Sequence, residues 1–444
     1  MPDPADFAPP LAQEFVQAAQ RIHRILFAPP GKAPTTSPHP SVMDLVYRGL
    51  KHWGLTQVRI ARLAPSPPPS LVLALLSVAW AALEEQRRPA HTVVDEAVAA
   101  AKALLPSSAK KISGFVNALL RKTLADVRSS QADWTHPVAR WNAPPWWIEK
   151  IQLQYGERSE EILSGLTARA PLTIRLLDAA PMSRAEFLAQ LGTLGRVGTP
   201  VGPHAVIIDP PMPVEEIPGF SEGWVSVQDA AAQRVVDAFS PQLFNSSKTH
   251  AMADRPALIL DACAAPGGKS IALAQHHRAT VWAVDVSAHR LARLRRDLVR
   301  VGSTLRGSVQ TAVADLLDPA ALARAGLPAS FDAVLLDAPC SASGVVRRHP
   351  EIPWKRTPEA LATVVHTQQQ LLDTLWGRVR PGGELVFVTC SIFLEEGEAQ
   401  QQAFLERTPD ARLMPSPGRL LPTAATEQGQ NHDGFFYARF NKQS

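Results

Sequence analysis

The sequence predicts a multidomain protein made of an all-α helical bundle, a small α+β module and a C-terminal α/β domain with a doubly wound parallel sheet. Apolar residues recur at helical spacing through the N-terminal part, with no strand pattern among them. Strands and a helix alternate in the middle, and from Ala257 onward short apolar strands alternate with helices. We therefore expect domains at residues 1–136, 137–237 and 238–444.

Composition narrows the class of protein. The chain has 444 residues, of which 45% are hydrophobic, enough for several packed cores. Its net charge of +4 permits a polyanionic partner. No apolar run reaches the length of about 18 residues that spans a membrane, and the first ten residues do not resemble a secretory signal. We therefore expect a cytoplasmic protein with no membrane contact, and we expect it to be monomeric.

The bundle is predicted from six helical segments, at residues 7–27, 41–50, 56–63, 70–86, 91–105 and 107–127. The last segment carries Lys110, Lys111 and Lys122. These cations could contact RNA phosphates, which would make the bundle an RNA-binding domain. A solvated helical face explains the same spacing equally well.

A helical connector and a small α+β module are predicted next. The connector, residues 134–170, concentrates four aromatic residues: Trp141, Trp146, Trp147 and Tyr155. Such side chains can stack on unpaired bases, but we favour packing against the next domain. The module that follows alternates a strand at 172–176, a helix at 183–191 and a strand at 205–208. We expect this module to contact RNA as well.

The C-terminal domain begins with a strand, a small-residue turn and a helix, in the segment ALILDACAAPGGKS. The strand covers residues 257–260 and Asp261 closes it. Lys269 and Ser270 open the helix. A turn of this kind before a helix N-terminus is where open α/β sheets bind nucleotides. The turn itself consists of residues small enough for a ligand to approach the backbone: Cys263, Ala264, Ala265, Pro266, Gly267 and Gly268.

Spacing within this segment favours an adenosine-type ligand. A phosphate-binding loop needs GxxxxGK[ST], but Cys263 occupies the position of the first glycine, and no GxGxxG is present. The next strand, residues 280–284, ends in Asp285, about 20 residues past the turn, where a carboxylate suits a ribose diol. S-adenosylmethionine (SAM), which has no pyrophosphate, fits both observations. An ordinary strand–turn–helix connection remains the alternative.

Polar residues also follow the later predicted strands, at 309–314, 331–336 and 384–388. These residues are Asp315, Asp337 and Cys390, and the loop after Asp337 adds Cys340. Because parallel strands place ligands at their carboxyl ends, we expect both cysteines to face one pocket. A lone cysteine is usually a small buried hydrophobe, but Cys263, Cys340 and Cys390 all lie in loops at this edge, without the CxxC spacing of a metal site. We expect no metal.

Two thiols beside SAM fit methylation of a pyrimidine at C5. One thiolate adds to C6, which makes C5 nucleophilic, and a second group assists release of the product. Asp337, if protonated, could donate to the ring N3, and Asp315 could contact the adenine amino group.

Several segments carry a resemblance to a known family. DACAAPGGKS, DAPCSASGVVRRHPEIPW, PGGELVFVTCSI and DGFFYARF resemble the RNA cytosine-C5 methyltransferases of the Sun/Fmu type. In the bundle, AHTVVDEAVAAAK and SGFVNALLRK resemble the antitermination factor NusB, and PGFSEGWVSVQDAAAQ resembles the family's entry into its catalytic domain. The resemblance covers nearly the whole chain. It implies a Rossmann-like, SAM-dependent enzyme that forms 5-methylcytosine in 16S ribosomal RNA.

The resemblance also implies roles for individual residues. Cys390, in TCS, is then the nucleophile, and Cys340, in the Pro-Cys motif, assists product release. Residues 263–269 form the SAM loop, with Lys269 directed towards the pocket as a further catalytic group. Asp285 then holds the ribose, while Asp315 and Asp337 complete the cofactor and cytosine contacts. The chain departs from the family in Ala314, where a glycine is usual, and in a longer loop at residues 240–255.

Three other functions remain to be separated from this one. DNA cytosine methyltransferases attack from the Pro-Cys cysteine and use a Glu-Asn-Val triad, which this sequence lacks. A transfer RNA cytosine methyltransferase would share the chemistry. A non-catalytic RNA-binding assembly factor would not need the pair Cys340 and Cys390 beside an intact SAM loop.

Overall fold

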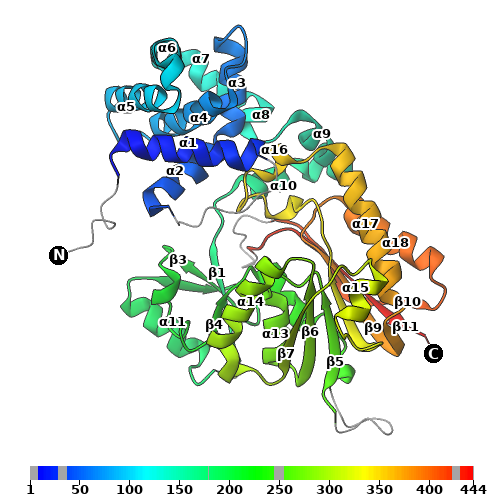
Figure 1. Ribbon diagram of the computed structural model, residues 1–444. Coiled ribbons are helices and arrows are strands. Elements are labelled where there is room, and N and C mark those ends of the chain that lie inside the picture. Colours follow the sequence, from blue (N-terminus) through cyan, green and yellow to red (C-terminus); the bar gives the residue numbers. More distant parts are fainter. Residues whose placement is uncertain (1–8, 29–37, 179, 245–254, 423–430, 444) are drawn as a thin grey trace. The chain divides into compact units, whose positions relative to one another are not determined.

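The computed structural model describes residues 9–28, 38–178, 180–244, 255–422 and 431–443, and it divides into two compact units (Figure 1). Unit 1 comprises Met1–Thr167 and His349–Arg356, and unit 2 comprises Ala168–Arg348 and Thr357–Ser444. No helix of the described part is both long enough and apolar enough to span a membrane.

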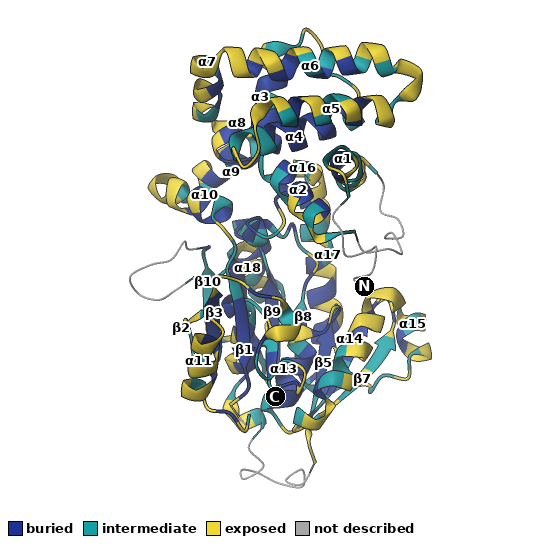
Figure 2. Ribbon diagram, turned by 90° about the vertical axis from the view of Figure 1, so that its left-hand side faces the viewer, coloured by how far each residue is buried: buried dark blue, intermediate teal, exposed yellow. Residues whose placement is uncertain are grey.

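Unit 1 is helical, as predicted, and its core forms around one apolar helix. In this helix, α4 (Ser70–Glu84), every residue from Val72 to Ala81 is buried, as Figure 2 shows by its dark blue ribbon. A helix that is apolar on all sides must be covered on all sides. The covering helices are amphipathic: α1 (Leu11–Phe27), α2 (Pro40–Lys51), α3 (Trp53–Leu63), α5 (Ala90–Leu104) and α6 (Ala109–Ala125).

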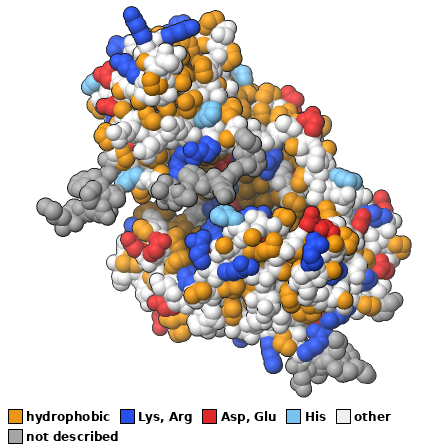
Figure 3. Space-filling model, viewed as in Figure 1, with side chains coloured by type: hydrophobic (Ala, Val, Ile, Leu, Met, Phe, Trp, Pro, Cys, Tyr) orange, Lys and Arg blue, Asp and Glu red, His pale blue; other side chains and the backbone are white. Residues whose placement is uncertain are grey.

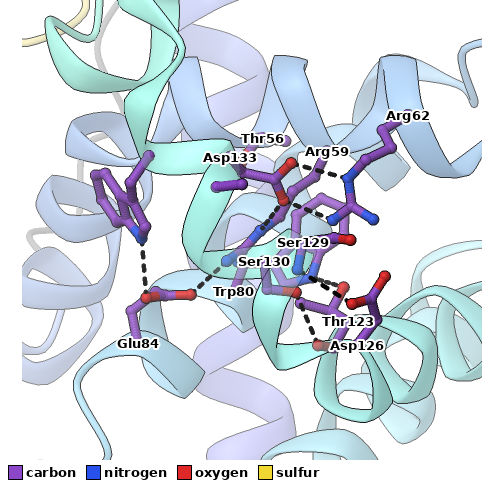
Figure 4. A network of polar contacts seen from close by, with 12 residues as sticks. Thr56, Arg59, Arg62, Trp80, Glu84, Thr123, Asp126, Ser129, Ser130 and Asp133 are labelled. Atoms are coloured by element: carbon purple, nitrogen blue, oxygen red, sulfur yellow. Dashed lines mark hydrogen bonds and ion pairs between the residues drawn. The ribbon is translucent and has the colours of Figure 1, made fainter.

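A polar network crosses the inside of this bundle (Figure 4). Arg59 of α3 is fully buried and pairs with Glu84 of α4 at 2.5 Å and with Asp133 at 3.4 Å. Arg62 donates to the same Asp133 from 2.6 Å. A charge buried without a partner costs several kcal/mol, so these residues must stay together for the bundle to fold.

The connector lies in unit 1 and is helical. Trp141 and Trp147 are buried, which agrees with packing as the role of these aromatic residues. Trp354, from the segment His349–Arg356, packs against the bundle core. The remaining helices of unit 1 are α7 (Val127–Ala132), α8 (Pro137–Arg140), α9 (Pro145–Tyr155), α10 (Ser159–Thr167) and α16 (Ile352–Lys355).

Unit 2 begins with a small antiparallel sheet of order β2-β3-β1-β4. Its elements are β1 (Leu172–Leu176), α11 (Arg184–Thr193), β2 (Val197–Pro200), β3 (Ala205–Asp209) and β4 (Val225–Val227), followed by α12 (Ala230–Gln233). The predicted strands at β1 and β3 and the predicted helix are confirmed. Strand β2 was not predicted, because it is short and largely exposed and therefore has no apolar alternation.

The larger sheet has the order β10-β11-β9-β8-β5-β6-β7. The predicted parallel strands are confirmed as β5 (Ala257–Ala262), β6 (Ala279–Asp285), β7 (Ser308–Val313), β8 (Phe331–Asp337) and β9 (Val379–Thr389). Two strands that were not predicted, β10 (Ala411–Leu420) and β11 (Phe435–Lys442), extend it with antiparallel pairing. Most of the loop at residues 240–255 lies outside the described residues.

Helices cover both faces of this sheet (Figure 1). Ile259 of β5 packs with residues of α13, whereas its neighbour Leu260 packs with residues of α17 and α18. Burial on both faces explains why the strands are continuous apolar runs. The helices are α13 (Gly268–His276), α14 (Ala288–Val301), α15 (Pro319–Arg324), α17 (Pro358–Trp376) and α18 (Glu398–Arg407).

Candidate active site

A cavity of about 390 Å³ lies at the carboxyl ends of β5 to β9. This is the edge at which a parallel sheet places its ligands. The structure brings seven of the predicted site residues together on its wall: Cys263, Ala265, Asp285, Asp315, Asp337, Cys340 and Cys390. The other predicted residues, Ala264, Pro266, Gly267, Gly268 and Lys269, belong to the adjoining turn and the start of α13 without lining the cavity.

The backbone conformation of the small-residue turn, residues 263–268, leaves no room for larger side chains at Gly267. Gly267 has φ = +103°, and a Cβ there would lie 2.3 Å from Leu294 Cδ1, so only glycine fits. Cys263 also adopts a left-handed conformation, with φ = +61°. The backbone N–H of Ala264 donates to Val284 O at 2.9 Å, which ties the turn to the end of β6. These contacts fix the backbone of the turn, from which Cys263 and Ala265 line the cavity.

Two carboxylates line the cavity, and each can accept further hydrogen bonds. Asp285 accepts hydrogen bonds from the backbone N–H of Ala265 at 3.1 Å and of Ser287 at 2.8 Å. Asp315 accepts one from the N–H of Leu317 at 2.9 Å. Because a carboxylate offers about four acceptor positions, both groups can also accept from ligand hydroxyl or amino groups. This donor and acceptor pattern fits the adenosine part of SAM.

The two loops that carry Cys340 and Cys390 are held against each other. The Sγ atoms of the two cysteines are 3.3 Å apart. The N–H of Ala338 donates to Val388 O and the N–H of Gly344 donates to Cys390 O, both at 2.9 Å. The predicted convergence of two thiols on one pocket is therefore what the structure shows.

The electrostatic surroundings of the two thiols differ. The hydrogen bond to Cys390, burial and the charge of Glu396 raise the pKa of Cys340 well above its ordinary value. Lys269 donates to Asp337 from 2.6 Å. Burial lowers the pKa of Lys269, but Asp337 and, to a smaller extent, Cys390 raise it by more, so Lys269 remains an ammonium ion at Asp337. Cys340 therefore stays a thiol.

The third cysteine is unsuited to nucleophilic attack. Burial and the neighbouring carboxylates, Asp337 first among them, raise the pKa of Cys263 to about 12. Thiolates, not thiols, are the nucleophilic form. Cys263 therefore contributes its small size to the turn.

The structure differs from the prediction at Asp261. The sequence predicts that Asp261 follows the strand as its closing residue, but it lies within β5, fully buried, and accepts a hydrogen bond from Ser270 Oγ. Burial raises its pKa to about 7. Asp261 is thus an internal tie between β5 and α13.

Several residues of the site were not predicted. Val286 and Leu317 follow the strand-end carboxylates by one and two positions, so their proximity could have been inferred. Thr367 and Leu371 come from α17, and no sequence signal connects that helix with the cavity. Glu396, six positions after Cys390, is buried beneath both cysteine loops.

Cations gather on two helical surfaces (Figure 3). In unit 2, Arg290, Arg293, Arg295 and Arg296 of α14 are exposed, and Arg290 also lines the cavity. In unit 1, α6 contains no acidic residue, and its exposed cations are Lys110, Lys111, Arg121 and Lys122. Exposed cations of this kind suit a polyanionic partner, and a solvated helical face has the same composition.

One cluster among the described residues has the spacing of a metal site, namely Asp178, His204 and His276. Its geometry favours contacts among these side chains over the binding of a cation. His204 Nδ1 is already hydrogen-bonded to Asp178 at 2.9 Å. Burial and the buried guanidinium of Arg175 lower the pKa of His276 to about 4, and the same positive charge repels a cation. None of the three lines the cavity at the ends of β5 to β9.

Three family models match separate parts of the chain. Residues 251–441 match the family model of the 16S rRNA methyltransferase RsmB/F. Residues 143–215 match the ferredoxin-like domain of RsmF/B-like methyltransferases, and residues 38–125 match the NusB family.

Relatives and solved structures extend this likeness. The chain is 38% identical over 378 residues to ribosomal RNA small subunit methyltransferase B of Vibrio cholerae, covering 83% of this chain and 81% of the relative. A crystal structure of a methyltransferase homologue from Pyrococcus horikoshii is 26% identical, with a TM-score of 0.53 over 69% of this chain and 97% of that one. The crystal structure of PH0851, 22% identical with a TM-score of 0.73 over 98% of this chain and 100% of that one, shares the fold.

Proposed function

Since this chain belongs to the RsmB/F family of 16S rRNA methyltransferases, we propose that it methylates C5 of one cytosine in 16S ribosomal RNA, with SAM as methyl donor. The observation that carries the cytosine-C5 chemistry is the pair of thiols, Cys340 and Cys390, 3.3 Å apart at a cavity with two strand-end carboxylates. A methyltransferase acting on an exocyclic amine or a ribose hydroxyl would have no need of a thiol pair.

The cofactor half of the cavity fits SAM. Asp285 is placed to accept from the ribose hydroxyls, Asp315 from the adenine amino group, and the turn from Cys263 to Lys269 lets the ligand approach the backbone. When bound, SAM supplies an electrophilic methyl group on a sulfonium sulfur. The protein's part is to hold the donor beside the thiols.

The thiol half of the cavity performs the covalent step. The Cys390 thiolate adds to C6 of cytosine, and the electron pair of the C5–C6 bond becomes available at C5 for methylation. Asp337 accepts a hydrogen bond from the Lys269 ammonium. When Asp337 protonates the ring N3, it therefore passes on a proton that Lys269 supplies. Both groups together stabilise the negative charge that addition places on the ring.

Release of the product restores the double bond. A base removes the C5 proton, the proton on N3 returns to Asp337, the C5–C6 double bond forms again, and the bond between C6 and the Cys390 sulfur breaks. The Cys340 thiol lies 3.3 Å from that sulfur and can donate a hydrogen bond to the departing thiolate. A group held as a thiol is suited to this task, and its raised pKa keeps it so.

The function is tested by methyl transfer from tritiated SAM to 16S rRNA, to small ribosomal subunits and to transfer RNA, followed by bisulfite mapping. We expect label in 16S rRNA and one protected cytosine. Label confined to transfer RNA would assign the second substrate class instead. No label on any RNA would leave the chain an RNA-binding assembly factor.

A further inference from the structure

A single buried carboxylate joins the two loops that carry the cysteines. Glu396 has 0% exposure and accepts four hydrogen bonds through its side chain. Its Oε1 accepts from the backbone N–H of Ser341 at 2.7 Å and from Gln368 Nε2 at 3.1 Å. Its Oε2 accepts from the hydroxyls of Ser341 and Ser391, each at 2.5 Å.

These partners are the immediate neighbours of the two thiols. Ser341 follows Cys340 in the chain and Ser391 follows Cys390. One carboxylate therefore fixes the residue after each cysteine to the same point, although the loops come from different strands, β8 and β9. The two serine hydroxyls are themselves 3.3 Å apart, as are the two sulfur atoms.

The position of Glu396 is fixed in turn from two sides. Its backbone carbonyl accepts from Thr389 Oγ1 at 3.0 Å, which closes the loop from Thr389 to Glu396 on itself. Gln368 of α17, which holds Oε1, also donates to Pro339 O at 2.8 Å, next to Cys340. Glu396 and its hydrogen-bond partners, called the joint below, thus connect both cysteine loops with α17, the helix that lines the cavity.

We infer that Glu396 is a positioning residue that sets the separation between the Cys340 and Cys390 sulfur atoms, a role that rests on the proposed two-thiol chemistry. An apolar side chain could fill the same space but could not accept from both serines. Without the contacts of Glu396, the two loops keep the backbone hydrogen bonds from Ala338 to Val388 and from Gly344 to Cys390, but the residues next to the two cysteines lose their shared partner. The sulfur atoms then sample larger separations, and cleavage of the bond between C6 and the Cys390 sulfur slows.

The test measures the separation of the thiols directly, without RNA or SAM. In a Cys263→Ala background, a short bifunctional thiol reagent bridges Cys340 and Cys390 only when both sulfur atoms are close. The rate of bridging is compared with the rate at which iodoacetamide alkylates each cysteine singly. Glu396→Ala and Glu396→Gln are the test variants. Glu406→Ala, an exposed glutamate of α18, is the matched control.

We expect Glu396→Ala to lower the ratio of bridging to single alkylation at least tenfold, and to lower kcat ten- to a hundredfold with the KM for SAM within twofold. Glu396→Gln keeps one acceptor oxygen, so its bridging ratio and its kcat should both lie between those of Glu396→Ala and those of the wild type. Glu406→Ala should resemble the wild type. An unchanged bridging ratio in Glu396→Ala, or an equal loss in Glu406→Ala, would overturn the inference.

Two further variants keep the test decisive if Glu396→Ala does not fold. Ser341→Ala and Ser391→Ala each remove one hydroxyl from the joint and leave the carboxylate in place. We expect each to lower the bridging ratio two- to fivefold. Wild-type ratios in both would contradict the inference. Because bridging requires no substrate, a failure of the proposed function would show instead as normal bridging without any methyl transfer.

Discussion

The two units use buried polar residues in opposite ways. In unit 1, Arg59 and Arg62 pair with Asp133 and Glu84, and the cations of α6 are left on the surface. In unit 2, carboxylates and thiols converge on a cavity, and Asp285 still has room to accept from a ligand. The contrast places the candidate chemistry in unit 2, whereas the buried charges of unit 1 pair with one another. Variants of each unit should therefore fail in different assays.

The largest effect is expected from Cys390→Ala. Removal of the attacking sulfur removes the covalent route to a nucleophilic C5, so methyl transfer should fall at least about a thousandfold. The measurement is single-turnover transfer from tritiated SAM. Affinity for SAM should stay within twofold, because the predicted cofactor contacts lie at the ends of β5, β6, β7 and β8, whereas Cys390 follows β9. Residual activity above one tenth of the wild type would assign the attack to another residue.

Asp285→Asn should weaken the binding of SAM and leave the two thiols unchanged. A hydrogen bond to a charged group contributes about 1.5–3 kcal/mol, so the Kd for SAM should rise roughly ten- to a hundredfold. Isothermal titration measures this directly. Asp178→Asn, an exposed carboxylate of the same unit outside the cavity, is the control. Equal Kd values for both variants would remove Asp285 from the SAM site.

Asp261 makes unit 2 sensitive to pH. Its pKa is about 7 in the folded protein, above its ordinary value of 3.8. Between these values the unfolded chain has released a proton that the folded chain keeps, so the contribution of Asp261 to stability falls as pH rises from about 4 to about 7. We expect the melting temperature of Asp261→Asn, relative to the wild type, to rise across this interval and then level off. A difference independent of pH would contradict the assignment.

The smallest effect is expected on the surface of unit 1. Replacing Lys110, Lys111 and Lys122 with glutamine should reduce the salt dependence of RNA binding, by about 0.7–0.9 in the logarithmic slope for each phosphate that the protein no longer neutralises. Filter binding across a salt series gives the slope. SAM affinity should not change. A slope equal to that of the wild type would exclude α6 from the RNA-binding surface.

Local sequence signals were enough to predict most strands and several site residues of unit 2. Strands buried on both faces appear as apolar runs, and each delivers a polar residue at its end, so Asp285, Asp315 and Asp337 could be placed on one edge. The resemblance to RNA cytosine-C5 methyltransferases of the Sun/Fmu type, with a NusB-like bundle, is confirmed at the level of the family by the comparisons. The boundaries at residues 136 and 237 stay predictions.

What the sequence did not show depends on contacts between distant segments. Strand β10 contains Pro415 and Pro417, which disfavour a strand, and it forms only by pairing with β11 across a bulge. Gln368 and Glu396 meet the cysteine loops only through tertiary packing. A glutamate six positions after a cysteine has no periodicity that would single it out.

The central claim is that Cys390 forms the bond to cytosine and Cys340 acts in its release. The most direct measurement is mass spectrometry of the protein–RNA adduct that Cys340→Ala leaves when incubated with SAM and 16S rRNA under otherwise productive conditions. The account predicts an adduct that survives denaturing electrophoresis, with the nucleotide attached to Cys390. An adduct formed by Cys390→Ala, with the nucleotide on Cys340, would contradict it.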